Sequence, residues 1–170
     1  MKIGLVDVDS KIPNLALMKI SAYHKSLGDE VKMFDPLFDN PDRIYSSKVF
    51  KSTDEYGYFP PNCEVLQGGS GHDLDVKLSN YIETMYPDYS LYGIDYAMGF
   101  TTRGCTRKCG FYIVPQKEGK LHPVADIHQF WNGQERLSIM DNNLAGDTEH
   151  FNSLLIKRLI IRSKPTLIKD

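Results

Sequence analysis

Cysteine is scarce in this sequence of 170 residues, in which only Cys63, Cys105 and Cys109 carry a thiol. An odd and small number of cysteines argues against the disulfide framework of a small secreted protein. Each thiol then has three possible roles: a reduced side chain in the core, a metal ligand or a redox group. The spacing of Cys105 and Cys109 has to separate these roles.

Long hydrophobic runs and an excess of one charge are also missing. No segment approaches the ~18 consecutive apolar residues of a membrane-spanning helix, and the opening MKIGLVDVDS places charges where a signal peptide has its apolar core. The sequence has 20 basic and 22 acidic residues, so its net charge is -2. We therefore predict a cytoplasmic protein with no membrane association and no general attraction to nucleic acid.

The first half of the sequence alternates between short runs typical of strands and one long helical pattern. A strand within residues 2–9 precedes a helix that begins near Pro13 and stops at Gly28. Helical periodicity is weak between residues 36 and 62, so at least one connection there should be irregular. Three more strands are expected within residues 30–36, 42–52 and 63–69. This order predicts a mainly parallel sheet with crossover connections.

Two acidic residues, Asp7 and Asp9, end the first predicted strand. The favoured interpretation makes Asp9 the cap of the helix that follows. If the first and fourth strands are neighbours, a small polar ligand or a magnesium-bound phosphate between these carboxylates and the glycines of residues 68–71 is the alternative.

The segment PDYSLYG, residues 87–93, is the expected seam between two domains, residues 1–90 and residues 91–170. A strand over residues 94–100 then leads into the cysteine loop, so the chemistry is predicted at the carboxyl end of a strand. The elements expected after the loop are a short helix within residues 124–131, a strand within residues 136–143 and a helix over residues 147–162. Asp147 is the expected cap of the last helix. The apolar side chains of that helix lie on one predicted stripe, made of Phe151, Leu154, Leu155 and Leu159.

The loop GFTTRGCTRKCGFYIVPQKEG places Cys105 and Cys109 four positions apart among glycines and basic residues. Iron-sulfur clusters need thiolates that project from a loop able to wrap around them. This loop resembles the cluster loop of the radical SAM superfamily, in which a CxxxCxxC pattern holds a four-iron cluster that binds S-adenosylmethionine. The resemblance implies that Cys105 and Cys109 are metal ligands and that Phe111 packs against the adenine of the cofactor, with simple core packing of Phe111 as the alternative.

The resemblance extends to both sides of the loop. Asp141 and Asn142 follow a predicted strand and are expected to meet the methionyl or ribose end of S-adenosylmethionine, with a simple turn as the alternative. The first ninety or so residues resemble the cobalamin-binding-like domain that precedes the barrel in many of these enzymes. Lys11 and Asn14 replace the histidine and glycine of its DxHxxG loop, and a protonated lysine does not ligate cobalt, so cobalamin is not expected.

Two departures from the superfamily bear on function. Tyr112 takes the place of the third cysteine, and a phenol is a hard, mostly protonated ligand that suits a reduced cluster poorly. Only about sixty residues follow Tyr112, too few for the remaining strand-helix units of a radical SAM barrel. Because an open barrel exposes strand edges and apolar helix faces, we expect a homo-oligomer or a missing barrel partner.

The predicted fold is α/β: a reduced flavodoxin-like or cobalamin-domain-like parallel sheet followed by an incomplete radical SAM (β/α) barrel. The favoured hypothesis for function is a truncated or degenerate radical SAM relative that does not cleave S-adenosylmethionine alone. One alternative is an iron-sulfur or metal-binding protein in which Cys63, His122, His128 or a partner's residue supplies the third ligand. A non-catalytic interaction module is another, and for the two loop thiols a reduced relic or a transient redox pair stays open.

Overall fold

The computed structural model describes residues 1–107, 109 and 113–162, and for residues 156–162 it describes the backbone alone. The chain packs into two units, one made of residues 1–101 and 125–140 and the other of residues 102–124 and the chain from Asp141 onward. Each unit is described by itself. The division into domains at residues 90 and 91 stays a prediction.

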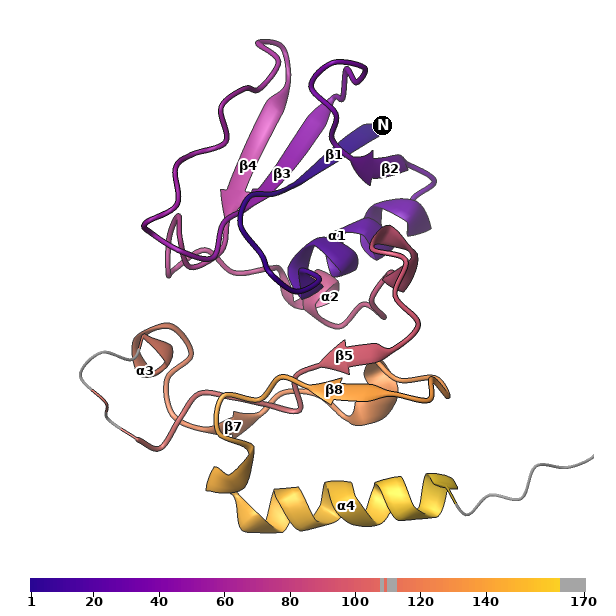
Figure 1. Cartoon of the computed structure of the whole chain (residues 1–170), viewed down its shortest axis with the longest axis vertical. Helices are drawn as coiled ribbons and strands as arrows, with labels where there is room; N and C mark the ends of the chain where they lie inside the picture. The colour runs from indigo at the N-terminus through magenta and orange to yellow at the C-terminus, as the bar shows by residue number, and fades with distance from the viewer. Residues whose placement is uncertain (108, 110–112, 163–170) are drawn as a thin grey trace, which may run out of the picture. The chain divides into compact units, whose positions relative to one another are not determined.

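A four-stranded parallel sheet forms the main layer of the first unit, in the order β2-β1-β3-β4 (Figure 1). Leu5 in the sheet pairs with Met33 on one side and with Tyr45 on the other. The predicted α/β class with a parallel sheet is confirmed, while the flavodoxin-like and cobalamin-domain-like assignments stay predictions. The strands are β1 (Lys2–Asp7), β2 (Glu30–Met33), β3 (Arg43–Ser47) and β4 (Glu64–Gly68).

Helix α1 (Leu15–Ser26) packs on one face of this sheet, where Leu17 and Ile20 join Ile3 and Leu5 in a buried cluster. The predicted cap at Asp9 is wrong. Asn14 is the N-cap, and its side chain accepts hydrogen bonds from the backbone N–H groups of residues 16 and 17. Asp9 lies too far upstream, because Pro13 and Asn14 still have to turn the chain into the helix.

The opposite face of the sheet is covered by irregular chain. A Cβ at Gly4 would lie 3.2 Å from the side chain of Phe34 and 3.3 Å from that of Pro41, so β1 meets the irregular β2–β3 connection directly at this position. Residues 36–62 form no α-helix, as the weak periodicity predicted. The aromatic rings of Phe34 and Tyr56 stand 6.3 Å apart, and such contacts replace the apolar stripe that a helix would supply.

A second core in the first unit surrounds the parallel pair β5 (Ala97–Gly99) and β8 (Leu137–Ile139). Tyr89, in the 3-10 turn η1 (Tyr89–Leu91), donates from its buried hydroxyl to the carbonyl of Phe130 at 2.5 Å. The hydroxyl also accepts from the N–H of Met98 at 3.1 Å. The short helix α2 (Asn80–Glu83) precedes this core in the chain.

The helix expected within residues 124–131 is reduced to the 3-10 turn η2 (Ile127–Gln129). Asp126 caps the turn by accepting from the N–H of His128. Phe130 then leaves the helical conformation at φ -136° and buries its ring against Gly99, where even a Cβ would collide with it. Packing of one aromatic ring therefore ends the helix after a single turn.

The second unit contains a small antiparallel pair, β6 (Thr102–Arg103) with β7 (His122–Pro123), and the helices α3 (Val114–Lys117), η3 (Leu144–Gly146) and α4 (Thr148–Arg162). Helix α4 tests two predictions. The predicted cap is confirmed, since Asp147 accepts from the N–H of His150 at 2.9 Å. Leu154 is buried but Leu155 is 45% exposed, so the predicted apolar stripe is wrong at that position. The side chain of Leu159 lies outside the described residues. None of the helices in the described part is both long and apolar enough to cross a membrane.

Candidate functional site

The cysteine loop begins where the chain passes from β5 into the second unit. Gly104 has φ +83°, and a Cβ there would collide with the backbone carbonyl of Lys120. Only glycine adopts this conformation in so little space. The N–H of Cys105 then donates to the carbonyl of Gly119 at 3.3 Å, so the first half of the loop is fixed to the segment around residues 119 and 120.

The two loop thiols have different environments. Cys105 is buried at 6% exposure and Cys109 is exposed, and both are free of disulfides. The sulfur of Cys105 accepts the backbone N–H of Arg107 at 3.4 Å. Backbone N–H groups aimed at sulfur are typical of thiolate ligands in metal sites, where they tune the bound metal. This geometry suits Cys105 as a ligand, and a reduced structural thiol can accept the same bond.

The segment after β8 is tied to the base of the loop. One oxygen of Asp141, Oδ2, accepts both the N–H of Thr102 at 2.9 Å and its hydroxyl at 2.7 Å. Asn143 donates to the hydroxyl of Thr106 at 3.2 Å. The described contact of Asp141 is therefore with this loop, and the role predicted for Asp141 and Asn142 at S-adenosylmethionine stays a prediction.

Part of the positive charge of the loop is neutralised within the unit. The guanidinium of Arg103 lies 3.1 Å from the carboxylate of Glu118, and both side chains are largely buried. Arg107 is exposed. An anionic substrate would thus meet less free positive charge here than the sequence suggests.

The ligands beyond the two thiols are not assembled in the described residues. Phe111 and Tyr112 lie outside those residues. Of the proposed substitutes, His122 donates from Nδ1 to the carbonyl of Lys120 at 2.8 Å, and Cys63 belongs to the other unit, where burial raises the pKa of its thiol. His128 packs its ring against Trp131.

No group of three or more His, Cys, Asp or Glu side chains in the described ranges is arranged to hold a metal ion. A four-iron cluster of the implied type needs three thiolates from the protein. In the second unit, the described part of the loop provides two thiols, those of Cys105 and Cys109.

Comparisons of this chain with protein-family models, with curated proteins and with solved structures gave no match. The resemblance to the radical SAM superfamily thus depends on the loop residues and their order along the chain. No relative supports a fold or a function for this chain, so any proposal depends on the geometry of the chain itself.

The first unit has its own expected ligand position, between the carboxyl ends of β1 and β3. The strand order changes direction between these two strands, and α/β sheets bind ligands at such points. Here the amide nitrogen of Asn14 donates to the hydroxyls of Ser10 at 3.1 Å and Ser47 at 2.9 Å. Asp7 accepts a hydrogen bond from the hydroxyl of Tyr92 at 2.5 Å. Burial raises the pKa of Tyr92, and this hydrogen bond to Asp7 raises it further. These polar groups therefore already have partners within the chain.

Asp9 serves the backbone of the β3–β4 connection. Its two oxygens accept the N–H groups of Val49 at 2.7 Å and Phe50 at 2.9 Å. Burial alone would raise the pKa of Asp9, but these hydrogen bonds outweigh burial and lower it. The alternative ligand site between the two aspartates and residues 68–71 required neighbouring strands. It is wrong in that form, because β3 lies between β1 and β4.

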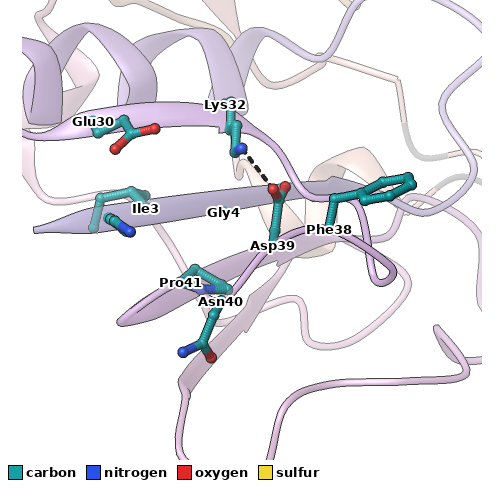
Figure 2. A pocket seen from close by; sticks show the side chains of 9 residues that line it. Ile3, Gly4, Glu30, Lys32, Phe38, Asp39, Asn40 and Pro41 are labelled. Carbon is teal, nitrogen blue, oxygen red and sulfur yellow. Dashed lines mark ion pairs between the residues drawn. The ribbon is translucent and has the colours of Figure 1, made fainter.

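A pocket of about 70 Å³ lies at the edge of the sheet where β1 and β2 begin (Figure 2). Lys32 and Asp39 form an ion pair across it at 2.5 Å, and the ring of Phe38 projects to one side. Sites for drug-sized ligands enclose ~300–1,000 Å³, so this pocket is too small for a cofactor.

Sequence reasoning missed one polar cluster, made of Lys48, Glu55 and His72. Lys48 follows β3, His72 follows the glycine-rich turn after β4, and Glu55 comes from the irregular connection between them. Their spacing matches no motif. The available signal was the position of His72 just beyond the strand expected within residues 63–69, whereas Lys48 lies inside the strand expected within residues 42–52.

Proposed function

We propose that this chain is a degenerate radical SAM relative, which keeps two thiols of the cluster loop and does not cleave S-adenosylmethionine alone. The observation that carries the proposal is the parallel pairing of β5 with β8, with the cysteine loop inside the connection between them. A strand, a cluster loop and a second parallel strand are the opening unit that the resemblance implies. Because Tyr112 replaces the third cysteine of the motif, the ligand set of the loop is incomplete, which argues that the chain has lost the cluster chemistry.

The environment of the loop supports the same proposal. The buried sulfur of Cys105 receives a backbone N–H, as a cluster ligand would, whereas Cys109 is exposed. Asp141, which the resemblance would place at the cofactor, has Thr102 as its described partner. A polar group released from a ligand has to find a partner inside the protein, and this contact supplies one.

Anaerobic reconstitution with iron and sulfide tests the proposal. The parent chain should bind well under four irons and show little absorption at about 400 nm, and Tyr112→Cys should raise the iron content toward about four per chain. Removing a loop ligand from that variant with Cys105→Ser should abolish the gain. Cys63→Ser in the same background is the matched control and should keep it, because Cys63 lies outside the loop.

Two results would overturn the proposal. A parent chain that binds about four irons, or that forms 5′-deoxyadenosine from S-adenosylmethionine under reducing conditions, retains the chemistry and draws a third ligand from elsewhere. A Tyr112→Cys variant that binds no more iron than the parent shows that the loop is not a cluster site in this chain, which favours the interaction module.

A further inference from the structure

A buried cation lies at the carboxyl edge of the main sheet, away from the cysteine loop in the chain. Lys48 follows β3 directly, and its side chain is 4% exposed. Its N–H donates to the carbonyl of Gly68 at 3.0 Å, and its carbonyl accepts the N–H of Gly71 at 2.9 Å. The ammonium donates to the carbonyl of Thr53 at 3.2 Å and to the carboxylate of Glu55. A buried ammonium requires such partners.

An imidazole lies beside the same carboxylate. His72 has a 10% exposed side chain, and its Nδ1 stands 3.3 Å from Oε2 of Glu55. Its other ring nitrogen, Nε2, is buried and has no hydrogen-bond partner within the described parts of the chain. The contact with Glu55 is therefore the polar contact that the described residues give this ring, and a buried imidazole depends on such a contact.

The backbone around the two side chains approaches so closely that glycine is required. Gly69 has φ +93°, and a Cβ there would collide with the carbonyl of Lys48. A Cβ at Gly71 would lie 2.8 Å from the Lys48 side chain and 2.9 Å from the carbonyl of Phe50. The turn after β4 is thus held against Lys48, which fixes the position of its ammonium relative to His72.

The carboxylate that lies between these groups belongs to Glu55. Glu55 comes from the irregular β3–β4 connection and is 58% exposed, yet both of its nitrogen partners are at least nine-tenths buried. The hydrogen bond from Lys48 holds the pKa of Glu55 below its ordinary value. Glu55 is thus an oxyanion reached from solvent that accepts a hydrogen bond from one buried nitrogen and lies 3.3 Å from a second, which is the arrangement of a ligand in its site.

We propose that Lys48 and His72 form a binding site for a small carboxylate, and that Glu55 occupies this site as an internal ligand. The position fits the rule that parallel sheets bind ligands beyond the carboxyl ends of their strands. A single negative charge is favoured, because the carboxylate of Asp9 binds the N–H groups of Val49 and Phe50, directly after Lys48, and already places a negative charge near the ammonium. A doubly charged phosphate would be repelled by Asp9.

Vacating the site in the full-length chain tests this proposal. In Glu55→Ala, the buried ammonium loses its main partner, so the melting temperature should fall. Sodium acetate should then raise it saturably, by at least about 3 °C more than sodium chloride at equal ionic strength. The imidazole ¹⁵N resonances of His72 should shift with acetate over the same concentrations. If Glu55→Ala fails to fold, Glu55→Gln keeps the volume of the side chain and serves as the second variant.

Three controls make the result specific. The parent chain should respond equally to acetate and chloride, as should Glu135→Ala, which removes an exposed glutamate elsewhere. Combining Glu55→Ala with Lys48→Met should abolish the acetate effect. The proposal is overturned if both Glu55 variants respond to acetate no more than to chloride, if the double variant still responds, or if phosphate stabilises more than acetate.

Discussion

Replacing Asn14 with alanine should destabilise the first unit more than an ordinary helix cap does. The side chain of Asn14 is 9% exposed and makes four hydrogen bonds. Its oxygen accepts two N–H groups of α1, at 3.1 and 3.3 Å, and its nitrogen donates to Ser10 and to Ser47. It therefore joins the start of the helix to the carboxyl ends of β1 and β3.

The expected cost follows from these contacts. Loss of an N-cap costs ~1 kcal/mol. Each of the two lost side-chain hydrogen bonds in this buried position adds ~1 kcal/mol, less whatever water restores. Asn14→Ala should thus lower the free energy of unfolding by about 2–3 kcal/mol. Asn14→Ser keeps a good cap but is too short to reach both serines, so its cost should be about 1–2 kcal/mol.

Urea unfolding, followed by circular dichroism, measures the stability of both variants. The dependence of the free energy of unfolding on urea concentration should equal that of the parent, so that a shift of the midpoint reports a change in stability. Ser79→Ala is the matched control, because Ser79 caps the short helix α2 through one exposed hydrogen bond of 3.4 Å, and it should cost less than about 1 kcal/mol. An Asn14→Ala cost below that of Ser79→Ala, or equal costs for alanine and serine at position 14, would refute the reasoning.

Two further predictions concern a phenol and the loop thiols. Burial raises the pKa of Tyr89 to about 12, so its contribution to stability is complete below about pH 10 and is lost as the pH rises through about 12. Urea unfolding between about pH 10 and pH 12 should show that the free energy of unfolding falls less steeply with pH in Tyr89→Phe than in the parent. An equal dependence on pH in the two proteins would contradict a raised pKa for Tyr89. Asp141→Ala should speed alkylation of Cys105 about tenfold by releasing Thr102, with Cys109 as the internal control in the same mass spectrum. Equal rates in parent and variant would show that Asp141 does not fix the loop.

The elements of the first unit were predictable where one local signal dominates. The β-branched run before Asp7 and the stop at Gly28 predicted β1 and the end of α1, since strand pattern and left-handed glycine act within a few residues. The cap was placed wrongly at Asp9, because Asp and Asn are equally good caps and the choice depended on Ser47, which is 33 residues from Asn14. Sequence alone does not measure such a contact.

In the candidate sites, too, local sequence motifs indicate some residues, while contacts between distant residues leave no motif. The role of Cys105 and Cys109 as metal ligands depends on a short sequence motif and stays a prediction, whereas the Thr102 contact of Asp141 depends on residues 39 positions apart and left no motif. The expected helix around residue 127 failed because a single ring, Phe130, packs against Gly99. The group of Lys48, Glu55 and His72 left no pattern, since an irregular connection supplies the residue that joins the other two.

Polar groups at the carboxyl ends of the strands share one property in both units: the chain itself supplies a partner. Asp7 binds Tyr92, Lys48 binds Glu55, and Thr102 binds Asp141. In an enzyme at work, groups in these positions are held ready for substrate, whereas a chain without its ligand must satisfy them internally, because an unpaired buried polar group costs ~1–3 kcal/mol. Internal partners can be permanent or exchangeable. Exposure separates the two cases, since Asp141 and Tyr92 are half-buried while Glu55 is open to solvent, so removing Glu55 leaves a position that an external carboxylate can reach.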